Sequence, residues 1–222
     1  MGSENLFHKR KAKDLKALKR TQKKRSPYDK VLIVCEGSKT EPNYLQEAID
    51  YYKLNTANVE VDNKCGSSPK SVLERARALY KASRKAGDPY DRVYCVIDKD
   101  SHSTYQSTID SIESLKPFFA ISSIPCFEYW ILLHFEKTRA PFHATGSKSI
   151  CESVESRLKT FKPEYEKGNS GLFLELLDSL ENAIKNAEQA LNEALRENEP
   201  NPSTNMHELI TYLRELSAPK RG

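Results

Sequence analysis

Apolar runs of strand length alternate with helical patterns through the first 135 residues. Val31–Cys35 is continuously apolar, which is typical of a strand covered on both faces in a parallel sheet. Residues 38–42 predict a helix start with a hydroxyl cap, an early acid and a proline in the first turn. Further strands are expected over residues 58–61, 92–97 and 118–121, and further helices over about 69–86 and 105–115. This alternation predicts an α/β fold with a mainly parallel sheet flanked by helices.

The second part of the chain has a different pattern. Residues 122–125 predict the start of a strongly apolar helix over 126–135, in which Trp130 belongs to the core and His134 is a partly buried, hydrogen-bonded side chain. From residue 149 to 216 the patterns are only helical, with a long helix through 172–197 and a last one over 207–216. We therefore expect three parts: an N-terminal arm over 1–28, an α/β domain over 29–140, and an all-helical extension over 141–222 packed on the same domain.

The N-terminal arm differs in charge from the rest of the chain. Residues 9–25 contain ten Lys or Arg and one Asp, a net charge of +9 within a chain whose total is +4, so the remainder is near −5. Such an arm is either a solvated terminus or a contact for phosphate or another acidic surface, and counterion release would make that contact strongly salt-dependent. The charge alone does not separate DNA, RNA and an acidic protein partner.

Several classes of protein are disfavoured by what the sequence lacks. No apolar stretch reaches the roughly 20 residues that a membrane helix needs, and the N-terminus has no apolar signal region, so we expect a cytoplasmic protein that makes no membrane contact. The five cysteines are widely spaced without a CxxC pair, which argues against a disulfide framework and a zinc site. There is no GxxxxGK[ST], GxGxxG or HExxH motif.

Acidic residues follow two of the predicted strands. Glu36 ends the first strand, and Asp98 and Asp100 end the third. Taken singly, each could simply mark where a strand leaves the core. If the two strands are neighbours, however, the three carboxylates meet at the sheet edge where ligands bind, and oxygen-only ligands select Mg²⁺ or Mn²⁺. The arrangement indicates a metal-dependent phosphodiester-processing site.

Four blocks of the sequence carry a resemblance to a known family. They are VLIVCEGSKTEPNY at 31–44, VYCVIDKD at 93–100, PCFEYWILLHF at 125–135 and NPSTNMHELI at 201–210. With these blocks the chain resembles the RloB/AbiL-type Toprim-related proteins of prokaryotic phage-defence systems, over nearly its whole length.

The resemblance implies a Toprim-like fold and roles for the three acids. Glu36 matches the glutamate that acts in general acid/base work, and Asp98 and Asp100 match the DxD pair that binds Mg²⁺. It also implies an ABC/OLD-type ATPase as partner, because the family is typically encoded beside one. By analogy with related ATPase–Toprim pairs, RNA such as tRNA is a plausible target.

Other residues of these blocks have two interpretations each. Lys39 could offset phosphate charge or be a surface residue at the helix start, whereas for Glu41 helix capping and surface charge are favoured. Glu128 is either an acid favoured by the helix dipole or a fourth carboxylate of the site. Asn201, Ser203 and Thr204 most simply cap the last helix, although they could return to the edge that carries the acids.

Two functions follow from these expectations. The first is a Mg²⁺-dependent nuclease that cleaves RNA or DNA in antiphage defence together with an ATPase, with Glu36, Lys39 and Glu128 as candidate catalytic residues. The second is a non-catalytic sensor or scaffold of a defence complex that binds nucleic acid or the ATPase.

Overall fold

A mainly parallel sheet forms the centre of the molecule. The computed structural model describes residues 29–54, 58–99 and 102–217. Within them five strands lie in the order β2-β1-β3-β4-β5, of which the first four are parallel and β5 is antiparallel to β4. Their bounds are β1 Val31–Cys35, β2 Val59–Asp62, β3 Arg92–Asp98, β4 Phe118–Ile124 and β5 Ser203–Thr204. The predicted α/β fold class is confirmed.

The first and third strands, β1 and β3, are neighbours in the sheet, which is the condition for their acids to meet at one edge. Val31 pairs with Arg92 and Cys35 with Val96. One residue further on, the backbone N–H of Glu36 donates to the carbonyl of Val96 over 3.0 Å. The acids that follow β1 and β3 are therefore brought to the same edge of the sheet.

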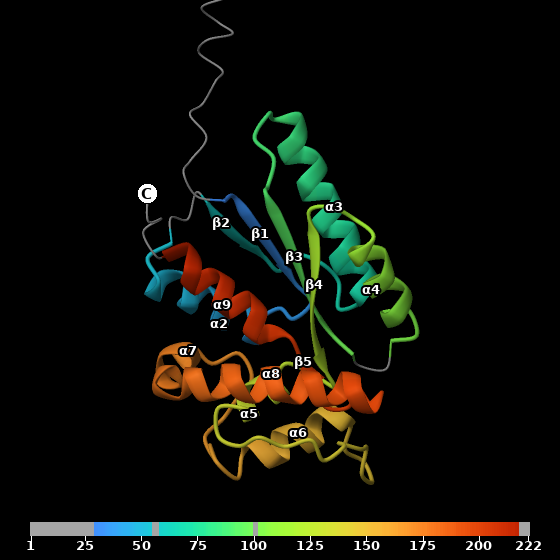
Figure 1. Cartoon of the computed structure of the whole chain (residues 1–222), viewed down its shortest axis with the longest axis vertical. Helices are drawn as coiled ribbons and strands as arrows, with labels where there is room; N and C mark the ends of the chain where they lie inside the picture. The colour runs from blue at the N-terminus through green and yellow to red at the C-terminus, as the bar shows by residue number, and fades with distance from the viewer. Residues whose placement is uncertain (1–28, 55–57, 100–101, 218–222) are drawn as a thin grey trace, which may run out of the picture.

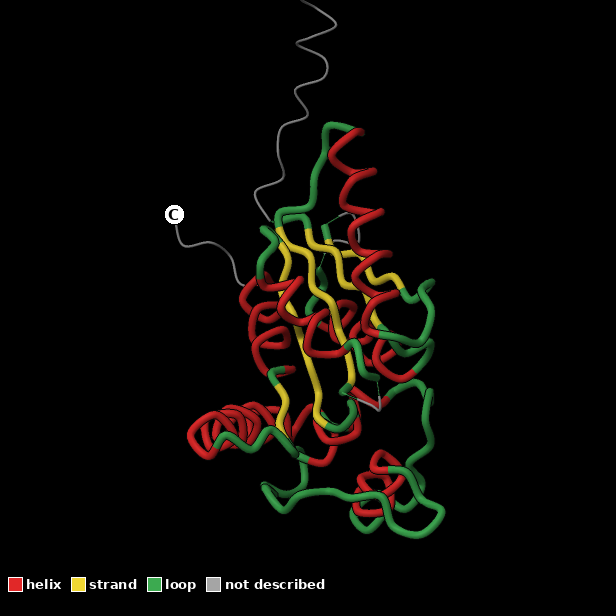
Figure 2. The backbone as a smooth tube through the Cα atoms, turned by 90° about the vertical axis from the view of Figure 1, so that its right-hand side faces the viewer, coloured by secondary structure: helices red, strands yellow, loops and turns green. Residues whose placement is uncertain are grey.

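Helices cover both faces of the sheet (Figures 1 and 2). α3 and α4 pack on one face, and α2 and α9 on the other, while α5, α6 and α8 lie at the end toward which the parallel strands point (Figure 1). Their bounds are α2 Thr40–Tyr51, α3 Pro69–Lys85, α4 Tyr105–Glu113, α5 Glu128–Leu132, α6 Ile150–Leu158, α7 Leu172–Glu175, η1 Leu177–Ser179, α8 Leu180–Glu197 and α9 Met206–Ser217. Among the described residues, none of these helices combines the length and the apolar character needed to cross a bilayer.

Alternate residues of the central strands enter two separate hydrophobic clusters. Ile33 and Val96 belong to the larger cluster, which includes residues of α2 and of α5 to α9. Leu32 and Val34 belong to the smaller one with α3 and α4. Both faces of β1 are thus buried, which explains why its sequence is apolar at every position.

The prediction for residues 122–135 was wrong in its boundaries. β4 continues through Ile124, and the only regular helix in this segment is α5, which begins at Glu128 and has five residues. Ser122 and Ser123 resemble a helix cap in the sequence, but both remain in the sheet. Ser123 pairs with Asp98 on one side and with Thr204 on the other, where the two hydroxyls are 3.0 Å apart.

The short strand β5 was not predicted, because residues 149–216 show only helical patterns. Ser203 and Thr204 return to the sheet and pair with Ile124 and Ser123. Asn205 continues the edge with its side chain: its Oδ1 accepts from the N–H of Ser122 over 2.7 Å, and its Nδ2 donates to the carbonyl of Ala120 over 3.0 Å. Thr204 also caps the last helix, since its hydroxyl accepts from the N–H of Met206.

The long helix expected over residues 172–197 is divided into α7, η1 and α8. The break occurs at Leu176, whose backbone leaves the helical region (φ −95°, ψ 2°) while its side chain stays buried. The Ser179 hydroxyl donates to the carbonyl of Leu176 and also meets Nδ1 of His134 at 3.0 Å. The break therefore brings a hydroxyl to a buried histidine.

His134 is hydrogen-bonded as expected but is buried more deeply than expected, with 4% of its surface exposed. Its Nε2 is 3.4 Å from the hydroxyl of Tyr44, so each ring nitrogen has a partner. Burial lowers the pKa of His134 from 6.5 to about 3. The fold thus holds the neutral imidazole, and its stabilising contribution is complete above pH ~6.5 and is lost as the pH falls toward 3.

We predict that His134→Gln removes this pH dependence. In wild-type protein the contribution of His134 to the free energy of unfolding should fall by about 1.4 kcal/mol between pH 7.5 and 5.5, because the unfolded chain takes up a proton there. Urea unfolding at both pH values should therefore show a wild-type advantage that shrinks by this amount. The exposed His143→Gln variant is the control. An equal advantage at both pH values would mean that the buried ring is not held neutral.

Candidate active site

A pocket of about 260 Å³ opens at the carboxyl edge of the sheet. It is formed by the turn after β1, the start of α2, the end of β3, the start of α5 and a loop before α7. The residues that line it are Gly37, Ser38, Lys39, Thr40, Glu41, Asp98, Glu128 and Lys167. Three of the five predicted site residues, Lys39, Asp98 and Glu128, thus share one pocket.

Glu36 lies directly beside this pocket. Its Oε2 accepts from the N–H of Asp98 over 3.3 Å, and its side chain is 11% exposed. Its other oxygen, Oε1, is 3.5 Å from Nε2 of His102, a residue for which the sequence suggested no role. The carboxylate of Glu36 is therefore held against the backbone at the end of β3.

Asp98 is the last residue of β3. Burial raises the pKa of its carboxyl group well above the ordinary value, and Glu41 and Glu128 raise it further, while the backbone N–H of Phe127 opposes the shift. The raised pKa of Asp98 thus reflects its burial first and the neighbouring negative charge second. Asp100, the second acid of the DxD pair, lies outside the described residues.

Glu41 is buried at the pocket, in contrast to the expected surface position. It is 8% exposed in the first turn of α2 and its side chain folds back over Gly37. A methyl group on Gly37 would overlap the Glu41 carboxylate, so the glycine makes room for this acid. Burial raises the pKa of Glu41 to about 7. A hydrogen bond to its own backbone N–H and the charge of Lys167 oppose this shift, and Glu128 and Glu36 add to it.

Glu128 is 3% exposed and is the first residue of α5. Its Oε1 accepts from the hydroxyl of Tyr165 over 3.1 Å and is 3.3 Å from Nζ of Lys167. Lys167 also forms an ion pair of 2.7 Å with Glu155 of α6. Partial burial lowers the pKa of Lys167, but Glu128 and Glu155 outweigh this effect and the pKa is raised. A permanent positive charge therefore faces the carboxylates.

Lys39 is exposed and precedes the first helical residue of α2 without making a side-chain cap. The expected hydroxyl cap at this start is absent, and the nearest hydroxyl, that of Thr40, instead accepts from the N–H of Gly168 over 3.0 Å. The two lysines of the pocket thus come from segments more than 120 residues apart that are joined by a hydrogen bond.

The donor groups at the pocket are those that a hard divalent cation prefers. Among the described residues no three His, Cys, Asp or Glu side chains are grouped closely enough to hold an ion. The Glu36 carboxylate accepts from the backbone N–H of Asp98, and the side chains of Glu36 and Asp98 both offer only oxygen donors. Mg²⁺ is commonly held by one or two carboxylates and completes its shell with water and phosphate oxygens. The carboxylate donors of Glu36 and Asp98 therefore fit the chemistry of this ion.

Three residues of this site were not predicted to belong to it. Glu41 was assigned to the surface because acids are common in the first turn of a helix. Tyr165 and Lys167 lie in a polar loop between α6 and α7, where no periodic pattern relates them to the strand ends. The PNY segment after Glu41 belongs to the first of the four sequence blocks, but its contact with the loop that contains Tyr165 and Lys167 arises only in the folded chain.

We predict that Glu41→Gln stabilises the protein at neutral and alkaline pH. Because the pKa of Glu41 is raised on folding, its carboxyl favours the folded state below pH 4.5, and this contribution is lost as the pH rises through 7. The advantage of the permanently neutral variant should grow by on the order of 2 kcal/mol between pH 5 and pH 8. Denaturant unfolding in EDTA measures it.

The matched control for this experiment is Glu74→Gln, which alters an exposed glutamate on α3. Its stability should follow that of the wild type at both pH values. A Glu41→Gln variant that also follows the wild type would show that Glu41 is ionised without cost in the fold.

Comparison with known proteins places the chain in a family. No curated protein and no solved structure matches it. The model of the family described as RloB-like protein matches residues 31–213, which include every element of the sheet and the whole pocket. The resemblance inferred from the four sequence blocks is confirmed. The chain belongs to the RloB-like protein family.

Proposed function

We propose that the protein is a Mg²⁺- or Mn²⁺-dependent nuclease whose site is the pocket at the carboxyl edge of the sheet. The observation that supports it best is the gathering of Glu41, Asp98 and Glu128 around one pocket with Lys167 as their cation. Burial alone would favour neutral or apolar side chains there, so three acids facing one cavity indicate a binding role.

In this proposal Glu36 and Asp98 hold the metal together with Asp100, as in a Toprim-like site. When bound, the ion would polarise a phosphate oxygen and lower the pKa of a coordinated water. The raised pKa of Asp98 supports a cation at this position, because burial and then Glu41 and Glu128 disfavour its negative charge, and a nearby positive charge would offset them.

The chain's own cations would bind the phosphodiester. Lys39 and Lys167 both line the pocket, and a phosphate between them would be held by charge from two sides. Lys167 has its ammonium 3.3 Å from Glu128, so Glu128 and Tyr165 orient the cation rather than contact the substrate. Glu36, beside Asp98, is the proposed acid/base or ligand.

The finer features of this function come from the family. We propose RNA such as tRNA, or DNA, as the substrate, antiphage defence in the cytoplasm as the setting, and an ABC/OLD-type ATPase as the partner that restrains or activates cleavage. These assignments rest on analogy with Toprim-related defence proteins.

A cleavage assay with Mg²⁺ and the partner ATPase tests the proposal. Asp98→Asn and Glu36→Gln should each reduce the cleavage rate by roughly 100-fold or more, because each removes a charge from the metal site. Lys167→Ala should reduce the rate by roughly 10- to 100-fold through loss of phosphate stabilisation. Rates on labelled RNA and DNA oligonucleotides give both the effect and the substrate class.

Asp110→Asn is the matched control, since Asp110 is an exposed acid on α4. Circular dichroism establishes that each variant is folded. Undiminished cleavage by folded Asp98→Asn or Glu36→Gln protein would remove this pocket from the chemistry.

A second function, the non-catalytic sensor or scaffold, is favoured by one observation. Glu128 is already neutralised by Lys167, so this acid needs no metal. Calorimetric titration with Mn²⁺ separates the two functions. Binding that is lost in Asp98→Asn supports the nuclease, whereas absence of binding together with intact complex formation supports the scaffold.

The basic arm adds a prediction that is independent of the site. Residues 9–25 carry a net charge of +9, and they lie outside the described residues. Deleting residues 1–25 should weaken nucleic-acid binding and reduce the slope of log K against log salt by several units, since each phosphate contact contributes about 0.7–0.9 to the slope. Metal affinity should not change. An unchanged salt slope would exclude the arm from nucleic-acid contact.

A further inference from the structure

One face of α2 carries three polar side chains that bind the backbone of the loop containing Lys167. The Thr40 hydroxyl accepts from the N–H of Gly168 over 3.0 Å, and Nδ2 of Asn43 donates to the Gly168 carbonyl over 3.0 Å. Glu47, one turn further along, accepts from the N–H groups of Gly171 and Phe173 over 2.5 and 2.9 Å. Spacings of three and four residues place all three on the same side of the helix.

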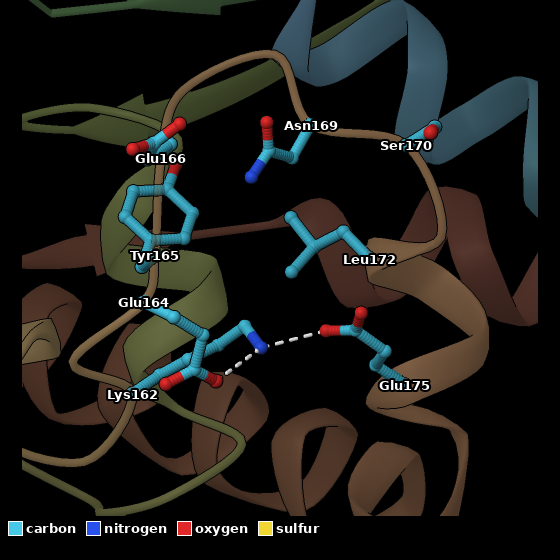
Figure 3. Close-up of a pocket in the computed structure, with 8 residues that line it drawn as sticks. All are labelled: Lys162, Glu164, Tyr165, Glu166, Asn169, Ser170, Leu172 and Glu175. Atoms are coloured by element: carbon cyan, nitrogen blue, oxygen red, sulfur yellow. Dashed lines mark hydrogen bonds and ion pairs between the residues drawn. The ribbon is translucent and has the colours of Figure 1, made fainter.

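The bound segment, residues 165–171, contains no helix or strand of its own. Gly168 has a φ of +82°, and a Cβ on it would lie 2.9 Å from Cβ of Lys39, so the chain passes close to α2 in a conformation that suits glycine. At its beginning, Lys162 forms ion pairs of 2.8 and 2.6 Å with Glu164 and Glu175, which tie this end to α7 (Figure 3). The 165–171 loop is therefore fixed by side chains from outside it.

The side chains that this loop presents inward reach the pocket. Tyr165 is buried and donates to Glu128, and Lys167 lies between Glu128 and Glu155. A lysine side chain has four flexible bonds and loses much conformational entropy when held in one place. Its position is defined only if the backbone that carries it is also fixed, and Gly168, the next residue, is held at both its N–H and its carbonyl.

We propose that Thr40, Asn43 and Glu47 are positioning residues that hold Lys167 over the pocket. Thr40 also lines the pocket, whereas Asn43 and Glu47 are not among its lining residues. All three act through the backbone of the 165–171 loop. The inference rests on the proposed nuclease function for its catalytic consequence, but the position of Lys167 can be measured without any cleavage. It also gives a physical role to the TEPNY segment that no catalytic assignment explains.

The position of Lys167 is tested by the reactivity of its amine. Acetylation with an N-hydroxysuccinimide ester, followed by peptide mass spectrometry, should be slow in the wild type, because the amine is ion-paired with two carboxylates. Asn43→Asp removes the donor without changing size, and Thr40→Val removes the hydroxyl without changing shape. Each should raise the labelling rate of Lys167 by about fivefold, the shift expected from one lost hydrogen bond.

Gln46→Ala is the matched control, because Gln46 is exposed on α2 and donates to Asp50 within the same helix. Labelling of Lys167 should be unchanged there, and labelling of the remote Lys81 on α3 should be unchanged in every variant. Lys167 reactivity equal to the wild type in both folded Asn43→Asp and Thr40→Val proteins would overturn the proposal.

A double-mutant cycle then separates positioning from general stability. In the wild-type background Asn43→Asp should lower the cleavage rate by about tenfold, as expected when a charged group is displaced from a phosphate. In the Lys167→Ala background the same change should have less than a twofold effect, because there is no cation left to position. Equal effects in both backgrounds would mean that Asn43 only stabilises the fold, and would overturn the proposal.

The two readouts distinguish failure of the positioning role from failure of the function. If labelling responds as predicted while wild-type protein with its partner and Mg²⁺ cleaves nothing, the loop holds Lys167 but the nuclease assignment is wrong. If cleavage depends on Asp98 and Lys167 while labelling is indifferent to Asn43 and Thr40, the nuclease stands and the positioning role is wrong.

Discussion

Crowding of like charge at one end of the sheet is the constraint on which the rest of the site depends. Glu41, Asp98 and Glu128 face a single pocket, and mutual repulsion together with burial raises the pKa values of the first two. Such an arrangement is stable only if the surrounding structure supplies compensating charge. Lys167 supplies part of it, and it can do so only because α2 and α7 hold the loop that carries it. Hydrogen bonds between α2 and a loop more than 120 residues away in the sequence thus hold the cation among the acids.

The parts of the fold that could be predicted are those with a local signal. β1 and β3 are continuous apolar runs that end in acids, and their parallel pairing follows from the helices between them. β5 could not be predicted, because a Ser-Thr pair becomes a strand only through its contact with Ser123 and Ile124. The C-terminal end of β4 was predicted wrongly for the same reason, because its two serines resemble a helix cap until their partners in the sheet are known.

The residues of the site also divide into those that have a local sequence signal and those that have none. Glu36 and Asp98 were found because strand ends in a parallel sheet meet at one edge. Glu41 was misplaced because its local context, the first turn of a helix, is where solvent-exposed acids are common. No local sequence pattern identifies Lys167 as a site residue, because its position depends on hydrogen bonds between residues more than 120 positions apart. Residues placed by long-range contacts of this kind have no periodic signature in the sequence.

The return of β5 to the sheet has a consequence for how the protein is made. Thr204 meets Ser123 across 81 residues of sequence, and the loop with Lys167 is synthesised long after Glu36 and Asp98. During translation Glu36, Asp98 and Glu128 emerge from the ribosome first, then Lys167, and β5 last of these. A chain synthesised only as far as α6 therefore carries the acids without their cation, and assembly of the site waits for residue 167.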